Sequence, residues 1–142
     1  MSATVQEIQD AIIAKLTSAL PELSVEAFPE KPEEYELLHP LGAVLVQYDG
    51  SAYSANRIGN GGVSQVRTLR FSVVYLVRNL RDAAGCYDVL ARGAEALVGL
   101  AIPGTVGAGT IVSESFNAET DGVWMYLQSY EFKAHQVATN HA

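Results

Sequence analysis

The fold of this chain is decided by the segment VSQVRTLRFSVVYLVRN, residues 63–79, which carries the longest β-strand pattern in the sequence. Its odd positions from 69 to 77 are all apolar, whereas its even positions mix polar and apolar side chains. Successive side chains of a strand point to opposite faces of a sheet. The odd positions therefore predict one continuous face that packs against a core.

The segments on either side of this strand predict two helices and four further strands. Apolar residues at helical spacing predict a first helix over residues 5–20, which Pro21 ends. Thr4 or Ser2 can cap its start, and Glu7, three residues beyond Thr4, would complete a capping box. The same spacing, with Asp82 as N-cap, predicts a second helix over residues 83–100. The other predicted strands are residues 23–28, 42–48, 110–119 and 123–135, and one helical turn is expected within residues 33–38.

The predicted order, α-β-β-β-α-β-β, describes an α+β fold with a single, mostly antiparallel sheet of about five strands and two helices on one face. The pair Asp121-Gly122 is a hairpin signal between the last two strands. A length of 142 residues predicts one domain, residues 1–142, with a frayed tail from about residue 136 to 142.

A glycine-rich stretch, DGSAYSANRIGNGG at residues 49–62, is predicted to be the loop before the long strand. It contains no lysine and leads into a strand, so it matches neither a phosphate-binding loop nor a dinucleotide-binding turn. Long loops without secondary structure are uncommon and often functional. Two interpretations remain: a mobile hairpin loop, or an arm that contacts a partner through Tyr53, Arg57 and Ile58.

The last predicted strand carries its aromatic residues on one face. Trp124, Tyr126, Tyr130 and Phe132 share one parity, and the apolar residues Val123, Met125 and Leu127 occupy the other. This pattern predicts burial on both faces in the first half of the strand. Either the aromatic residues decorate an outer face, or a second subunit covers that face, since Tyr and Trp are common interface anchors.

Nothing in the sequence predicts an enzyme, a metal site or a cofactor site. The single cysteine, Cys86, is predicted to be a small buried thiol in the second helix, and one cysteine cannot form an intramolecular disulfide. The histidines, His39, His135 and His141, lack the close pairing that metal sites use. No catalytic, cofactor-binding or metal-binding residue is therefore assigned.

The net charge of −7 disfavours sequence-specific binding to DNA or RNA, because a net-acidic surface repels the phosphate backbone. Arginines are concentrated in the central third of the chain and acids in the first third, which favours head-to-tail contact between copies. No apolar run reaches the length of a membrane span, and the first residues do not resemble a signal peptide. These features predict a cytosolic protein without membrane contact.

The chain contains the stretches PEEYELLHPLGAVLVQYDGSAY (32–53), RTLRFSVVYLVRNLR (67–81) and DGVWMYLQSYEF (121–132). They resemble a family of Mu-like phage and prophage proteins encoded among tail genes, which is similar in layout to tail terminator (tail completion) proteins. The resemblance covers about residues 8–132. It implies a structural protein of a contractile tail, found in the virion tail and, during assembly, in the host cytoplasm.

The same resemblance implies the partners. Terminator proteins form a homo-oligomeric ring, commonly a hexamer, which caps the tail tube protein and meets the head–tail connector or neck protein. The residues expected at such contacts are Tyr53, Arg57, Ile58, Arg67, Trp124, Tyr126 and Tyr130. The alternatives are a neck or head-completion adaptor and, in a different class, a small ligand-binding domain or enzyme.

Overall fold

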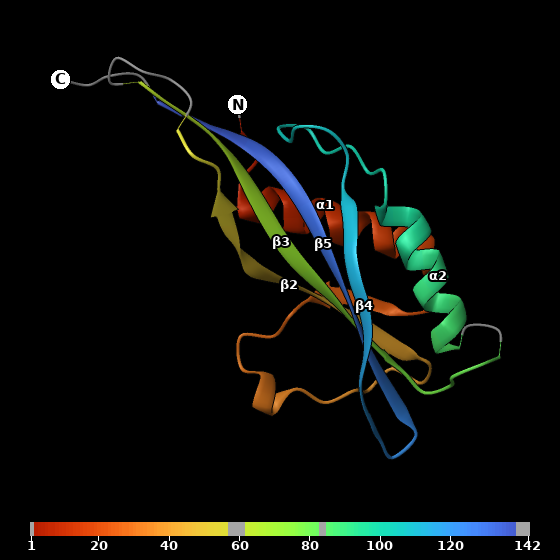
Figure 1. The fold of residues 1–142 in the computed structure, drawn as a ribbon. Coiled ribbons are helices and arrows are strands. Elements are labelled where there is room, and N and C mark those ends of the chain that lie inside the picture. The colour runs from red at the N-terminus through yellow and green to blue at the C-terminus, as the bar shows by residue number, and fades with distance from the viewer. Residues whose placement is uncertain (1, 57–61, 83–84, 139–142) are drawn as a thin grey trace.

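The computed structural model describes residues 2–56, 62–82 and 85–138. Within them, a sheet of five strands packs on one face against two α-helices (Figure 1). The elements are α1 (Val5–Ala19), β1 (Ser24–Ala27), the 3-10 turn η1 (Pro32–Glu34), β2 (Gly42–Tyr53), β3 (Val63–Val77), α2 (Cys86–Leu97), β4 (Thr110–Thr120) and β5 (Val123–Ala138). The α+β class and the order of elements predicted from the sequence are confirmed.

The strands lie in the order β1-β2-β3-β5-β4. β1 runs parallel to β2, and the other neighbouring pairs are antiparallel. β3 pairs with β5 along its whole length, from Val63 opposite Ala138 to Val77 opposite Trp124. β3, which carries the longest β-strand pattern of the sequence, is therefore the middle strand of the sheet.

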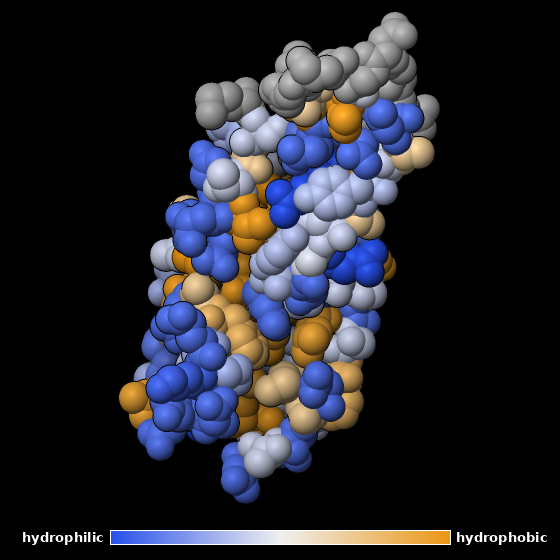
Figure 2. Space-filling view, turned by 90° about the vertical axis from the view of Figure 1, so that its left-hand side faces the viewer, coloured by the Kyte–Doolittle hydropathy of each residue, from blue (hydrophilic) through white to orange (hydrophobic). Residues whose placement is uncertain are grey.

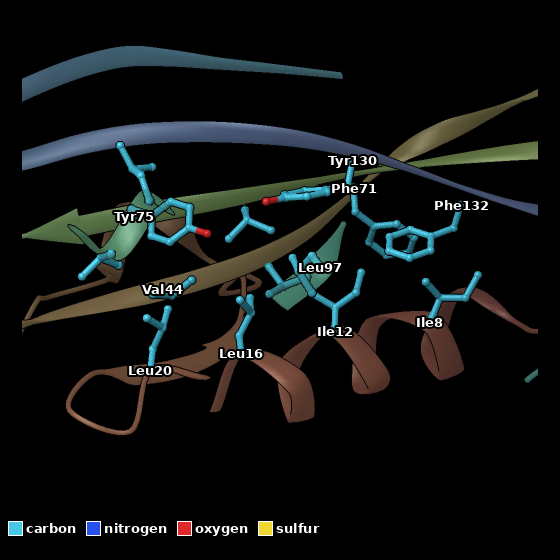
Figure 3. Close-up of a cluster of buried hydrophobic side chains, with 14 of the residues drawn as sticks. Ile8, Ile12, Leu16, Leu20, Val44, Phe71, Tyr75, Leu97, Tyr130 and Phe132 are labelled. Atoms are coloured by element: carbon cyan, nitrogen blue, oxygen red, sulfur yellow. The ribbon is translucent and has the colours of Figure 1, made fainter. Parts of the chain in front are cut away.

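The main core lies between the sheet and the helices. The odd positions of β3 from 69 to 77 are all fully buried: Leu69, Phe71, Val73, Tyr75 and Val77. α1 meets them with a buried stripe at helical spacing: Ile8, Ile12 and Leu16. Figure 3 shows the two sets of side chains pointing toward one another. Burial of each such side chain contributes about 1.5–3 kcal/mol, so this face supplies most of the stabilising burial.

The first helix begins as the sequence predicts, and the second does not. Thr4 and Glu7 form the capping box of α1. α2 begins at Cys86 with Gly85 as N-cap, so the prediction of a start at residue 83 capped by Asp82 is wrong. The N–H groups of Cys86 and Tyr87 donate to the backbone carbonyl oxygens of residues 79 and 80, which satisfies the helix start without a side-chain cap. The helix ends at Leu97, three residues earlier than predicted.

β2 and β5 are longer than the sequence predicts. β2 continues to Tyr53, so the first residues of the predicted loop belong to a strand. A β-bulge at Asp49 shifts the register there, and Asp49 accepts a hydrogen bond from the Ser72 hydroxyl. β5 continues to Ala138, where it pairs with the start of β3. The predicted fraying is therefore wrong for residues 136–138, and residues 139–142 lie outside the described ranges.

The second face of the sheet is covered in part by the chain's own Pro-rich segment, residues 28–37. Phe28, Tyr35 and Leu37 pack against the outward-facing side chains of the sheet. A groove of about 300 Å³ remains between this segment and the sheet. Figure 2, in which the left-hand side of Figure 1 faces the viewer, shows hydrophobic side chains between hydrophilic ones. The segment is too short and too rich in proline to form a helix, so only η1 interrupts its irregular course.

Candidate subunit interface

The ends of three strands form an arm that extends past the start of α1 (Figure 1). We define the arm as residues 50–56, 62–68 and 133–138. Hydrogen bonds continue across it beyond β2: Ser54 exchanges backbone and hydroxyl bonds with Val66, and the Asn56 side chain accepts from the Ser64 N–H at 2.8 Å. The described part of the arm is therefore an ordered extension of the sheet, where the sequence predicts a loop.

Tyr53 and Arg67, both predicted interface residues, lie together on the helix-side face of the arm. The Arg67 guanidinium carbon lies 5.6 Å from the centroid of the Tyr53 ring, a cation–π distance. Arg67 also donates to the Ser51 hydroxyl at 3.0 Å and to the Tyr48 hydroxyl at 3.2 Å. The hydrogen bond between the Tyr48 and Ser51 hydroxyl groups, followed by the hydrogen bond and charge of Arg67, lowers the pKa of Tyr48 despite some burial. The arm thus displays a positioned cation beside a half-exposed aromatic ring.

Arg57 and Ile58, the other predicted anchors of this region, lie outside the residues that the structure describes.

A second cluster lies where α2, β4 and β5 meet. We call it the aromatic patch, and its members are Tyr87, Phe116, Trp124 and Tyr126. Phe116 lies 5.5 Å from Tyr126 and 6.2 Å from Trp124 between ring centroids, and Tyr87 lies 6.4 Å from Tyr126. Phe116 is 54% exposed and Tyr87 48%. Burial raises the pKa of Tyr126, with the neighbouring Tyr87 adding to the effect. A contiguous surface of this kind is typical of a protein contact.

The sequence predicts two members of the patch and misses two. Trp124 and Tyr126 were expected from their parity on β5. Counting back through the hairpin at Asp121-Gly122 does not find Phe116, because it places Asn117 opposite Tyr126, and only the bulge after Phe116 brings Phe116 to that position. No local signal identifies Tyr87, because its contact with Tyr126 depends on where α2 crosses the sheet.

The aromatic side chains of β5 point toward the helices and not toward the outer face of the sheet. Tyr130 and Phe132 belong to the main core, and Tyr130 has no exposed surface in this chain. The interpretation of a tyrosine-decorated outer face is therefore wrong. Because Tyr130 is buried, we do not retain it among the proposed contacts. Burial raises its pKa.

A buried amide joins the edge of the sheet to its core. Gln128 is fully buried and accepts hydrogen bonds from the hydroxyl groups of Tyr75 and Tyr130 at 2.7 and 2.6 Å. Its side-chain nitrogen donates to the Leu90 carbonyl oxygen at 3.0 Å and to a Glu114 carboxylate oxygen at 2.7 Å. Every polar atom of the amide has a partner, so the polar group stabilises one arrangement of α2, β3, β5 and β4.

β4 is the outermost strand and is exposed along its length. Within the described ranges its only strand partner is β5, and Ala118 is its only residue that is half-buried and not exposed. Its large apolar side chains Ile111, Val112 and Phe116 all face solvent in part. A long edge strand with apolar side chains is a surface on which further pairing can occur.

The described residues hold no group of three or more His, Cys, Asp or Glu side chains arranged for a metal ion. Cys86 is buried, and burial together with the Glu114 carboxylate raises the pKa of its thiol to about 11. The His39 ring nitrogen accepts backbone hydrogen bonds from Leu41 and Gly42. Neither α1 nor α2, the two α-helices of the described part, is long and apolar enough to cross a membrane.

Comparison with known proteins gives a matching family and solved structures of similar fold. The profile of the Gp37 protein family matches residues 12–142. A chain from the solved virion of a native gene transfer agent particle is similar in structure, with a TM-score of 0.52 and 17% sequence identity. The similarity covers 97% of this chain and 100% of that one, so the two share a fold over their whole length. No curated protein matches. Since the family profile spans all but the first helical turns, the chain belongs to the Gp37 protein family.

Proposed function

We propose that this protein is a structural morphogenesis protein of a phage-type particle and acts as the tail terminator. It forms a ring, most simply a hexamer, on the end of the tail tube and joins the tube to the head–tail connector. The observation that carries this proposal is the shared fold over the full length of a chain from a gene transfer agent virion. Membership of the Gp37 protein family agrees with it.

The surface of the protein supports a role in assembly. A closed ring of identical subunits needs two different surfaces on each copy, one of which binds the other on its neighbour. The arm and the aromatic patch are two such surfaces, because they lie at opposite ends of β5 and differ in chemistry. Of the contacts predicted from the sequence, Tyr53, Arg67, Trp124 and Tyr126 belong to them.

The charge of the chain supports a ring through which DNA passes. A formal charge of −7 on each copy is multiplied by the number of copies. Such a ring repels phosphate, so DNA would move through it without adhering.

The test is electron microscopy of particles assembled without this protein. Tubes longer than normal are expected if it terminates polymerisation, and adding the purified protein to growing tubes should restore their length. Tubes of normal length that fail to join heads would instead identify a neck or head-completion adaptor. Complete, normal particles would overturn a structural role altogether.

A further inference from the structure

The sheet has an unpaired stretch on each of its two edges. One is β4, whose outer side has no strand partner among the described residues. The other is the distal part of β2, because β1 pairs only with residues 43–46. Phe28 adds one more hydrogen bond to Val46, and Pro29 then ends the pairing since proline has no N–H group. From Gln47 to Tyr53, β2 is therefore an open edge within the described ranges.

The directions of these two edges are compatible. β2, β3, β5 and β4 are linked by three successive antiparallel pairings. β2 and β4 therefore run in opposite directions within one chain. If copies of the chain stand side by side in the same orientation, β4 of one copy meets β2 of the next in an antiparallel pair, the more stable of the two arrangements.

Each edge has a short regular run beside its bulges, and the two runs have the same length. β4 carries bulges after Ile111 and after Phe116, which leaves a regular run at residues 113–116. β2 carries its bulge at Asp49 and is regular again at residues 50–53. Bulges disrupt pairing and are a common protection of edge strands against uncontrolled association. Here they limit new pairing to two short runs of equal length.

The side chains beside these runs are complementary. The described arm contains Arg67 and Lys133 and no acid, whereas β4 contains Glu114 and Glu119 and no base. On the helix side of the sheet, Glu114 and Phe116 of β4 would lie beside Tyr53 and Arg67 of the neighbouring arm. That arrangement brings together a carboxylate and a guanidinium, and two aromatic rings.

We infer that a second copy of this chain adds its arm to the edge of β4, so that residues 51–53 of β2 in one copy pair with residues 114–116 of β4 in the next, with Ala52 opposite Ser115. The sheet then continues from subunit to subunit around the ring, and the aromatic patch closes over the joint. This inference rests on the proposed ring and specifies how its subunits meet.

Site-directed cross-linking tests the pairing. Ser115→Cys places a thiol on the outer face of β4, and Ala52→Cys places one on the same face of β2. The two variants are mixed with and without tail tubes and treated with a short bismaleimide, which tolerates a register offset of a residue or two. A covalent dimer is expected from the mixture and not from either variant alone. Native Cys86 is buried and does not react, and Lys15→Cys on the exposed side of α1 is the matched control.

The outcomes separate the pairing from the ring itself. The oligomeric state is measured in parallel by native mass spectrometry. An oligomer whose Ser115→Cys variant cross-links to itself has a symmetric contact between two β4 strands, which overturns the inference and leaves the proposed function standing. An oligomer in which neither the mixture nor a single variant cross-links also overturns the inference. If no oligomer forms, with tubes or without, both the pairing and the ring are wrong.

A charge substitution gives an independent readout that needs no engineered thiol. Arg67→Glu should weaken self-association by about tenfold or more, since it places a carboxylate beside Glu114 of the neighbour. Arg67→Lys keeps the charge and should retain most of the association. Equal association by both variants would contradict the contact between the arm and β4.

Discussion

The two halves of β3 have the same backbone and opposite environments. From Leu69 to Val77 the strand is buried on almost every residue, whereas from Val63 to Thr68 every residue is half-buried. The first region is held by helices that pack over apolar side chains, and the second by hydrogen bonds to neighbouring strands. One strand thus serves both as the centre of the core and as the centre of the arm. Stability and assembly should therefore respond to different residues of it.

The largest effect is expected from the core half. Phe71 is fully buried between the Tyr48 and Phe132 rings, so Phe71→Ala should lower the free energy of unfolding by about 3–5 kcal/mol. The matched change in the arm half, Val66→Ala, should cost less than about 1 kcal/mol because Val66 is only half-buried. Urea denaturation followed by circular dichroism measures both. Equal costs would abolish the distinction between the halves.

A smaller effect is expected where α2 touches the core half. A Cβ atom at Gly93 would overlap the Tyr75 hydroxyl, so Gly93→Ala should destabilise the protein by about 1–3 kcal/mol through overpacking. Adding Tyr75→Phe removes the overlapping oxygen and should recover part of that loss in a double-mutant cycle. If Gly93→Ala leaves the free energy of unfolding unchanged, the close approach of α2 to β3 does not require glycine at position 93.

The buried thiol beside this contact predicts a dependence on alkaline pH. The pKa of Cys86 is raised from 9.0 to about 11, so between these values the unfolded chain loses the thiol proton while the folded chain keeps it. The free energy of unfolding therefore falls as pH rises from 9 to 11, and this loss is about 1 kcal/mol at pH 10. Cys86→Ala should lose correspondingly less stability between pH 8 and pH 10. Denaturation curves of both proteins at the two pH values provide the comparison, and parallel losses would contradict it.

The smallest effect on stability is expected in the arm. Arg67→Ala removes a cation–π contact and two half-buried hydrogen bonds, so it should change the free energy of unfolding by about 0.5–1 kcal/mol. Its effect on self-association, measured by analytical ultracentrifugation, should be the larger of the two. A strong loss of stability with unchanged association would reverse the roles assigned to the halves.

The features that the sequence predicts correctly are those set by neighbouring residues. The buried parity of β3, the Thr4 capping box and the turn at Asp121-Gly122 each depend on a few adjacent positions. The missed features depend on contacts far along the chain. The continuation of β2 past its bulge involves Ser72, which is 23 positions from Asp49.

The candidate site divides in the same way. The sequence identifies Tyr53, Arg67, Trp124 and Tyr126, because strand parity and residue type are local properties. It places Tyr130 at a surface, since parity alone cannot tell which face of the sheet the helices cover. It also misses Tyr87 and the cover provided by residues 28–37, because both depend on how separate elements pack together.

The tight packing of Trp124 against Phe116 supplies a built-in optical reporter. Trp124 is the sole tryptophan of the chain, so all of its indole emission originates next to the strand proposed to receive a neighbouring subunit. Exclusion of solvent from that ring on docking would shift the emission maximum toward the blue. Subunit joining could then be followed in real time on unlabelled protein.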